Sequence, residues 1–156
     1  MNTVIDQKAP EFSLVNTEGE TVSLSKIIEK DNVVLLFFPL AFSSVCTEEL
    51  CTIRDNMKLY NSMDAKVIGV SVDSHFTLNA FKKTENLNFT LLSDFNKSVA
   101  PKYDSLYKNF HGMNGVTKRS AFVINQDRKI KYKQVLDDAE NEPDYKAIIE
   151  TLSGLG

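Results

Sequence analysis

Hydrophobic residues alternate with polar ones near the start of the chain and then form a continuous run. Alternate apolar positions within residues 12–14 and 22–24 flank the turn-forming residues 16–19, a pattern that predicts a short β-hairpin. Residues 33–38 are apolar at every position, which is typical of a strand covered on both faces in a parallel or mixed sheet. We therefore expect a small N-terminal hairpin followed by a central strand.

The next apolar residues recur at steps of three and four, which is the spacing of one face of a helix. The residues that form this stripe are Leu50, Ile53, Met57 and Tyr60. They predict a single helix that begins near Cys46. Residues 66–72 are typical of a second buried strand, so the segment from 33 to 72 predicts a β-α-β unit.

The second half of the chain continues this succession of elements. Ser74 is placed to cap a helix that turns Leu78 and Phe81 inward, and Pro143 is placed in the first turn of a last helix. The other expected elements are a strand at 89–92, a helix around 99–103, and a hairpin of strands at 121–124 and 130–135. The order predicts an α/β fold of the thioredoxin-like kind, with a central mixed β-sheet flanked by helices and an N-terminal β-hairpin extension. We expect residues 1–156 to form a single domain.

The composition of the chain indicates which kind of protein it is and which partners are not expected. The chain has 156 residues, 42% hydrophobic and 25% charged, as in one globular domain with a substantial core. Its longest apolar stretch, residues 33–42, is about half the ~20 residues that cross a bilayer. Residues 1–6 lack the features of a secretory signal, so we expect a cytoplasmic protein. The net charge is −3 and the lysines lie among acids, so we expect neither a nucleic acid nor a membrane as partner.

The two cysteines, Cys46 and Cys51, are the candidates for chemistry. Two cysteines are too few for a disulfide framework, and neither histidine lies at a ligand spacing from them, so a zinc site is not expected. Cys46 falls in the first turn of the helix predicted after the central strand, where unpaired N–H groups and the helix dipole favour an anion. Ser43 or Ser44 can supply a hydroxyl donor close to the sulfur or to a peroxide oxygen. The position also suits an inert buried thiol, and position alone does not separate the two interpretations.

A sequence motif favours the reactive thiol over the inert one at Cys46. Pro39, Ser43 and Cys46 match the Pro-x-x-x-Thr/Ser-x-x-Cys signature, and the chain resembles the peroxiredoxin family (AhpC/TSA superfamily) over nearly its whole length. The resemblance extends from Ala9-Pro10-x-Phe12 to Arg119-x-x-Phe122-Val123-Ile124. It is closest to the AhpE-like branch and to the bacterioferritin comigratory protein, or peroxiredoxin Q, branch.

The resemblance implies roles for individual residues in a thiol peroxidase that needs no cofactor. Cys46 would be the peroxidatic nucleophile that attacks hydrogen peroxide or an organic hydroperoxide and becomes a sulfenic acid. Arg119 would stabilise the thiolate and the charge developing on oxygen, Ser43 would occupy the family's hydroxyl position, and Pro39 would shield the sulfur. Glu49 would orient Arg119 or complete a capping interaction, although an exposed helical glutamate needs no function. Because the helix N-terminus and Arg119 both favour the anion, we expect a depressed pKa for Cys46.

Cys51 lies five residues after Cys46, the spacing of a resolving cysteine in peroxiredoxin Q enzymes. In an intact helix the two Cα atoms would be roughly 8 to 9 Å apart, whereas a disulfide requires about 7 Å or less. An intramolecular disulfide therefore requires the first turn of the helix to unwind. The alternative is that Cys51 is a structural thiol and that the protein is a one-cysteine peroxidase.

Other functions and partners stay open. A thiol-disulfide oxidoreductase would share the fold but uses Cys-x-x-Cys, and a non-enzymatic redox sensor or holdase would use Cys46 without turnover. The family implies a thioredoxin- or glutaredoxin-type reductant, and its branches include both monomers and homodimers. Residues 104–118 match no family template and are expected to form a lid, a dimer surface or an ordinary loop.

Overall fold

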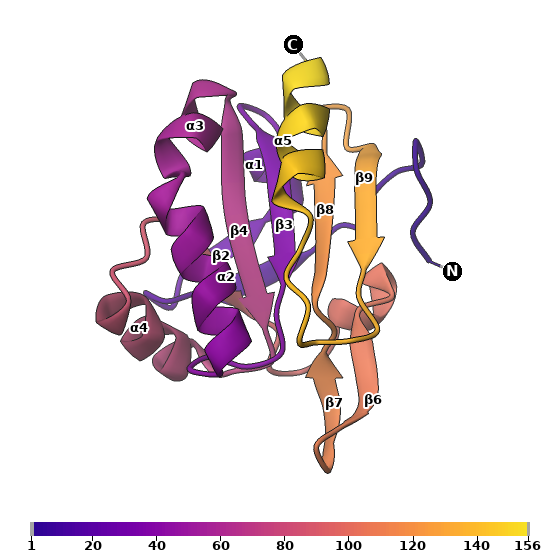
Figure 1. Cartoon of the computed structure of the whole chain (residues 1–156). Helices are drawn as coiled ribbons and strands as arrows, with labels where there is room; N and C mark the ends of the chain where they lie inside the picture. Colours follow the sequence, from indigo (N-terminus) through magenta and orange to yellow (C-terminus); the bar gives the residue numbers. More distant parts are fainter. Residues whose placement is uncertain (1, 156) are drawn as a thin grey trace.

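A seven-stranded mixed sheet forms the centre of the computed structural model, which describes residues 2–155 (Figure 1). Its strand order is β2-β1-β5-β4-β3-β8-β9. β3 (Asn32–Phe37) pairs in parallel with β4 (Ala65–Ser71) and antiparallel with β8 (Ser120–Ile124). Residues 33–37 are all buried, as expected for a strand covered on both faces. The central strand predicted at 33–38 is confirmed.

The outer strands complete the sheet. They are β1 (Ser13–Asn16), β2 (Thr21–Ser23), β5 (Thr90–Ser93) and β9 (Ile130–Val135). The N-terminal hairpin is confirmed, because β1 and β2 pair antiparallel around the turn at 16–20. The C-terminal hairpin of β8 and β9 is also confirmed. Leu24 lies outside the first hairpin because it begins a short helix, α1 (Leu24–Ile27), that the sequence pattern did not predict.

Helices cover both faces of the sheet. The apolar sides of α2 (Ser44–Asp55), α3 (Met57–Ser62), α4 (His75–Thr84) and α5 (Tyr145–Gly154) pack on one face, in the cluster that contains Val34 and Leu36. α1 and the 3₁₀ helix η1 (Ala100–Tyr103) pack on the other face, in the cluster that contains Val33 and Leu35. None of the described helices is long and apolar enough to cross a membrane.

Three of the predicted helices and the ends of several strands differ in detail from the pattern. β3 ends one residue before Phe38, and β5 lies one residue later than the strand predicted at 89–92. The single helix predicted from Cys46 to Tyr60 is two helices, because Asn56 leaves helical geometry (φ −109°, ψ 11°). Pro143 precedes α5, whose N-cap is Asp144, and so does not lie in its first turn. The helix expected around 99–103 is only the 3₁₀ turn η1, and β4 ends one residue before Val72. The cap predicted at Ser74 is confirmed, since its side chain accepts a hydrogen bond from the Thr77 amide.

Residues 104–118 contain a second, two-stranded sheet. β6 (Leu106–Phe110) pairs antiparallel with β7 (Met113–Thr117), and the hairpin projects from one end of the main sheet (Figure 1). The turn between them uses left-handed backbone at His111 and Gly112 (φ 52° and 85°). The segment is thus neither an irregular loop nor part of the main sheet.

Candidate active site

Cys46 lies in the first turn of α2, as the sequence predicted. The chain leaves β3 at Phe37, turns through residues 38–43, and enters the helix at Ser44 with Ser43 as extended N-cap (φ −73°, ψ 150°). The sulfur points into the core, and Cys46 has no exposed surface. The turn is held partly by Phe42, which has left-handed backbone (φ 68°) and whose ring packs on Phe81 of α4 with centroids 5.0 Å apart.

Arg119 brings its guanidinium to this sulfur from the position just before β8. Its Nη2 donates a hydrogen bond to Cys46 Sγ at 3.3 Å, and its Nη1 donates to Glu49 Oε1 at 2.6 Å. Its Nε donates to the main-chain oxygen of Ala139 at 2.9 Å. The side chain is only 2% exposed, so these three contacts fix the planar group in one orientation. The structure therefore brings Cys46, Arg119 and Glu49 together.

Glu49 is fully buried one helical turn after Cys46. Its Oε1 pairs with Arg119, and its Oε2 has no hydrogen-bond partner. Burial raises the pKa of this carboxyl to about 7, although Arg119 opposes the shift, while the charge of Glu142 adds to it. Glu49 is therefore buried, and the alternative of an exposed helical glutamate without a function is wrong.

The environment of Cys46 contradicts the prediction of a depressed pKa. Burial raises the pKa of the thiol, and this effect outweighs the guanidinium of Arg119 and the hydroxyl of Ser43, which both lower the pKa. Glu49 adds a smaller upward contribution. The expected charge partner is present, but complete removal of the sulfur from water is a tertiary effect that the position of a residue in a helix does not reveal.

Ser43 and Pro39 belong to the turn that covers the sulfur. The Ser43 hydroxyl donates to the main-chain oxygen of Leu40 at 2.9 Å, so in this conformation it stabilises the turn. Pro39 is buried, and its main-chain oxygen accepts a hydrogen bond from the Thr117 hydroxyl at 3.3 Å, which also bonds the oxygen of Phe38 at 2.6 Å.

Two residues that the sequence analysis missed also hold this turn. Thr117 reaches it from β7, as described above, and Asp73 reaches it from the end of β4. Asp73 Oδ2 accepts hydrogen bonds from the Ala41 amide and from the Ser71 hydroxyl, both at 2.7 Å. No short motif links these residues to Cys46, because both contacts depend on the arrangement of strands in the sheet.

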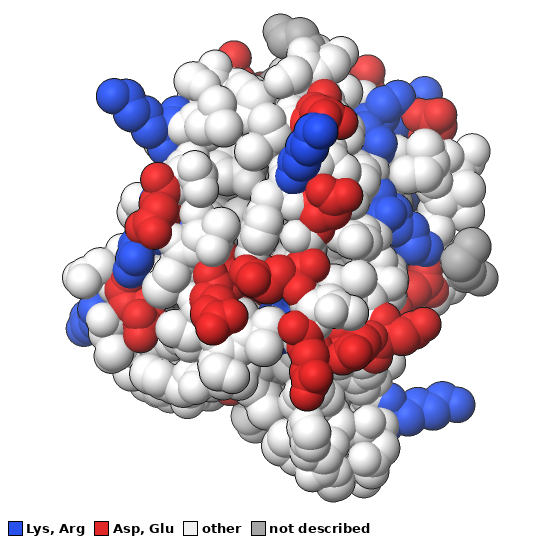
Figure 2. Space-filling view, in the orientation of Figure 1, with Lys and Arg blue, Asp and Glu red and all other residues white. Residues whose placement is uncertain are grey.

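A groove of about 780 Å³ opens beside the buried sulfur. Its lining comes from residues 43–45 at the start of α2, from Arg119, from the β6–β7 hairpin (Tyr107, Asn109, Phe110 and His111) and from residues 137–140. Figure 2 shows acidic side chains gathered on the face that carries α2 and the segment leading into α5. An acidic rim disfavours anions but does not oppose an uncharged peroxide.

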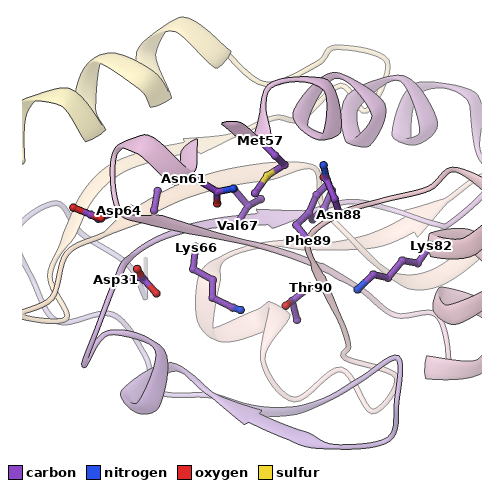
Figure 3. A pocket seen from close by; sticks show the side chains of 11 residues that line it. Asp31, Met57, Asn61, Asp64, Lys66, Val67, Lys82, Asn88, Phe89 and Thr90 are labelled. Carbon is purple, nitrogen blue, oxygen red and sulfur yellow. The ribbon is translucent and has the colours of Figure 1, made fainter. Parts of the chain in front are cut away.

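A second hollow, of about 350 Å³, has a different character. It lies against α3 and the beginnings of β4 and β5, and Lys66, Lys82, Asp31 and Asp64 lie around it (Figure 3). It contains no predicted site residue and no cysteine. Its charged groups are of both signs and lie at the amino ends of the parallel strands, whereas Cys46 follows the carboxyl end of β3. We therefore locate the candidate site at the groove beside Cys46.

Cys51 lies on the same uninterrupted helix as Cys46 but faces different groups. Its sulfur donates a hydrogen bond to Glu85 Oε2 at 3.6 Å, and both cysteines are free thiols. Because α2 is intact from Ser44 to Asp55, the two Cα atoms are separated by the roughly 8 to 9 Å of a regular helix. In residues 2–155 no group of three or more His, Cys, Asp or Glu residues could hold a metal ion.

Comparison with known proteins gives a consistent result. The sequence model of the AhpC/TSA family matches residues 5–133. Peroxiredoxin Bcp of Bacillus subtilis (strain 168) is 37% identical over 148 residues, which cover 89% of this chain and 94% of the relative. Peroxiredoxin Bcp of Escherichia coli (strain K12) is 32% identical over 150 residues, covering 92% of each chain.

Solved structures that resemble this chain also come from peroxiredoxins. The crystal structure of peroxidoxin BcpB from Mycobacterium tuberculosis superimposes with a TM-score of 0.88 at 27% identity, covering 99% of both chains. The reduced 2-Cys peroxiredoxin of Plasmodium vivax superimposes with a TM-score of 0.86 at 26% identity, covering 98% of this chain and 82% of that one.

Proposed function

The chain belongs to the AhpC/TSA family of peroxiredoxins, which are thiol-dependent peroxidases on a thioredoxin-like fold, and from this premise we propose that Cys46 is its peroxidatic cysteine. The observation that carries the proposal is the hydrogen bond of 3.3 Å from Arg119 Nη2 to Cys46 Sγ inside the buried site. A guanidinium fixed at a sulfur stabilises its anion and cannot itself lose its proton.

Burial holds the pKa of Cys46 above its ordinary value, so the peroxidatic step begins with loss of the thiol proton, which ends on the leaving oxygen. The resulting thiolate, stabilised by Arg119, attacks one oxygen of hydrogen peroxide or an organic hydroperoxide. A sulfur–oxygen bond forms, the oxygen–oxygen bond breaks, and the other oxygen leaves with a proton as water or alcohol. Arg119 stabilises the negative charge that passes from sulfur to the leaving oxygen, and Glu49 holds the guanidinium in place. Pro39 and Ser43 shape the turn that keeps bulk water from the sulfur.

We assign Cys51 as the resolving cysteine. The first turn of α2 unwinds after oxidation, the Cys51 sulfur attacks the sulfenic acid of Cys46, and water leaves as the intramolecular disulfide forms. A thioredoxin- or glutaredoxin-type protein then reduces this disulfide. The alternatives are a one-cysteine peroxidase with a structural Cys51, or a sensor that passes its oxidation to a partner. The cytoplasmic location and the choice between monomer and homodimer stay predictions.

Steady-state peroxide consumption tests the proposal. With thioredoxin and its reductase, or with a glutaredoxin system, the wild-type protein should consume many equivalents of peroxide, and Cys46→Ser should consume none above background. A single equivalent consumed with every reductant would instead indicate a sensor.

A further inference from the structure

The Cys51 thiol has a specific partner that the steps above do not use. Its sulfur donates a hydrogen bond to Glu85 Oε2 at 3.6 Å, between α2 and the residue that ends α4. Glu85 is half-buried, so the contact is partly shielded from water. A carboxylate carries only acceptors, and the contact therefore directs the thiol proton towards Glu85.

The part of α2 that carries Cys51 is anchored to the end of α4. Arg54 Nη1 donates to the main-chain oxygen of Glu85 at 2.6 Å, and Asn88 Nδ2 donates to the main-chain oxygen of Arg54 at 3.3 Å. Ile53 is fully buried in the core. The first turn, in contrast, is held at Cys46 by the sulfur itself, through Arg119. Oxidation changes that sulfur, so we expect the turn of Cys46 to open while Cys51 stays beside Glu85, although the bond between Arg119 and Glu49 must also yield.

The surroundings of Cys51 keep its thiol protonated, so the thiol needs a proton acceptor before it can attack. Arg54 and Asp55 face it from its own helix, and Glu85 faces it from α4. Burial, the largest cause, raises the pKa of Cys51; Glu85 and Asp55 add to the rise, and Arg54 opposes it. At neutral pH Cys51 is therefore a thiol, which is a poor nucleophile until its proton is removed.

Building on the proposed resolving role of Cys51, we propose that Glu85 is the general base of the resolving step. As the sulfur–sulfur bond forms, the Cys51 proton passes to Glu85, and the sulfur–oxygen bond of the Cys46 sulfenic acid breaks. The departing hydroxide takes up one proton from the solvent and leaves as water, and Glu85 then releases the proton of Cys51 to the solvent, so no net proton is gained or lost. Cys51 is oxidised and the Cys46 sulfenic acid is reduced in the same event, so no further oxidant or reductant takes part.

The test is the rate of disulfide formation after one equivalent of hydrogen peroxide, followed by rapid acid quench and mass spectrometry between pH 6 and 10. Glu85→Gln should slow this step about tenfold or more at pH 7. The difference in rate between wild type and variant should disappear as the pH rises above the pKa of Cys51, because the thiol then loses its proton without a base. Glu85→Asp should restore part of the rate. Asp55→Asn is the matched control, because it removes a negative charge near Cys51 that makes no hydrogen bond to it. Sulfenic acid formation and thermal unfolding of the reduced variants should match the wild type.

The outcomes separate this inference from the function on which it rests. A Glu85→Gln rate equal to or faster than wild type at pH 7, or a slowing that is uniform with pH, would overturn the role of Glu85 while leaving Cys51 as the resolving residue. Wild-type protein that forms no intramolecular disulfide would overturn both.

Discussion

Arg119 contacts two side chains that define the candidate site, Cys46 and Glu49. Arg119→Lys keeps a positive charge but loses the planar fork, and we expect the second-order rate constant with peroxide to fall about a hundredfold or more. The lysine variant is preferred to Arg119→Ala, because removing one partner of a buried ion pair destabilises a protein by about 3 to 5 kcal/mol. Stopped-flow measurement of Cys46 oxidation gives the rate constant.

Arg128 offers a matched control, because it lies in the turn between β8 and β9, away from the site. Arg128→Lys should leave the rate constant unchanged. An Arg119→Lys protein that unfolds cooperatively and reacts at the wild-type rate would remove Arg119 from the mechanism.

The buried carboxyl of Glu49 predicts a pH dependence of stability. Its pKa is 4.5 for an unperturbed glutamate and about 7 in the folded protein, so between these pH values the folded state binds more protons than the unfolded state. The free energy of unfolding contributed by this group must therefore decrease as the pH rises from about 4.5 to 7. Denaturant titrations should give a lower free energy of unfolding at pH 8 than at pH 5 for the wild type, and a smaller decrease for Glu49→Gln. Equal losses would indicate that Glu49 is ionised throughout.

Sequence information predicted which residues lie together in the candidate site better than it predicted their pKa values. Cys46 and Arg119 are 73 positions apart, and only the family resemblance associated them with each other and with Glu49. The pKa of Cys46 could not be predicted, because it depends on burial by segments from across the fold. Thr117 and Asp73, which hold the turn over the sulfur, escaped prediction for the same reason.

Helix α2 has two incompatible tasks in the proposed mechanism, since Cys46 reacts with peroxide in the folded first turn and with Cys51 only when that turn opens. We expect Cys51→Ser to react once with peroxide at the wild-type rate, to accumulate sulfenic or sulfinic acid, and to lose most of its turnover with thioredoxin. Normal turnover of Cys51→Ser would make the protein a one-cysteine peroxidase.

The same opening should be visible in the backbone. Amide hydrogen exchange of residues 44–50 should accelerate on oxidation of wild-type protein, whereas β3 and β4 should stay protected. In oxidised Cys51→Ser, where no disulfide holds the turn open, the acceleration should be smaller than in wild type. Unchanged exchange in an oxidised wild-type protein that carries the disulfide would contradict the unwinding.

Helices and strands with a clear hydrophobic pattern were predicted from the sequence, whereas their first and last residues were predicted less well. The apolar run 33–37 of β3 and the Ser74 cap followed from local rules. The break at Asn56 did not, because the apolar stripe continues across it from α2 into α3. The β6–β7 hairpin was missed because only two of its ten strand residues are buried, both at the end of β7, so no buried face imposes an alternating pattern.

At the scale of the whole molecule, the groove depends on three separate segments meeting beside Cys46: the start of α2, the β6–β7 hairpin and residues 137–140. The rings of Tyr107 and Phe110 in its lining are suited to contact the alkyl part of an organic hydroperoxide, if the groove binds the substrate as proposed. Phe110→Ala should therefore raise KM several-fold for a bulky organic hydroperoxide and leave the kinetics with hydrogen peroxide unchanged. An equal effect on both substrates would contradict binding in the groove.

The central claim, that Cys46 is the residue that peroxide oxidises, is tested most directly by mass spectrometry of tryptic peptides after one equivalent of hydrogen peroxide and a sulfenic acid trap. We expect the trap on Cys46 in Cys51→Ser, a Cys46–Cys51 disulfide in wild type, and no rapid oxidation of Cys46→Ser. Rapid peroxide consumption by Cys46→Ser, with the trap on Cys51, would contradict the account.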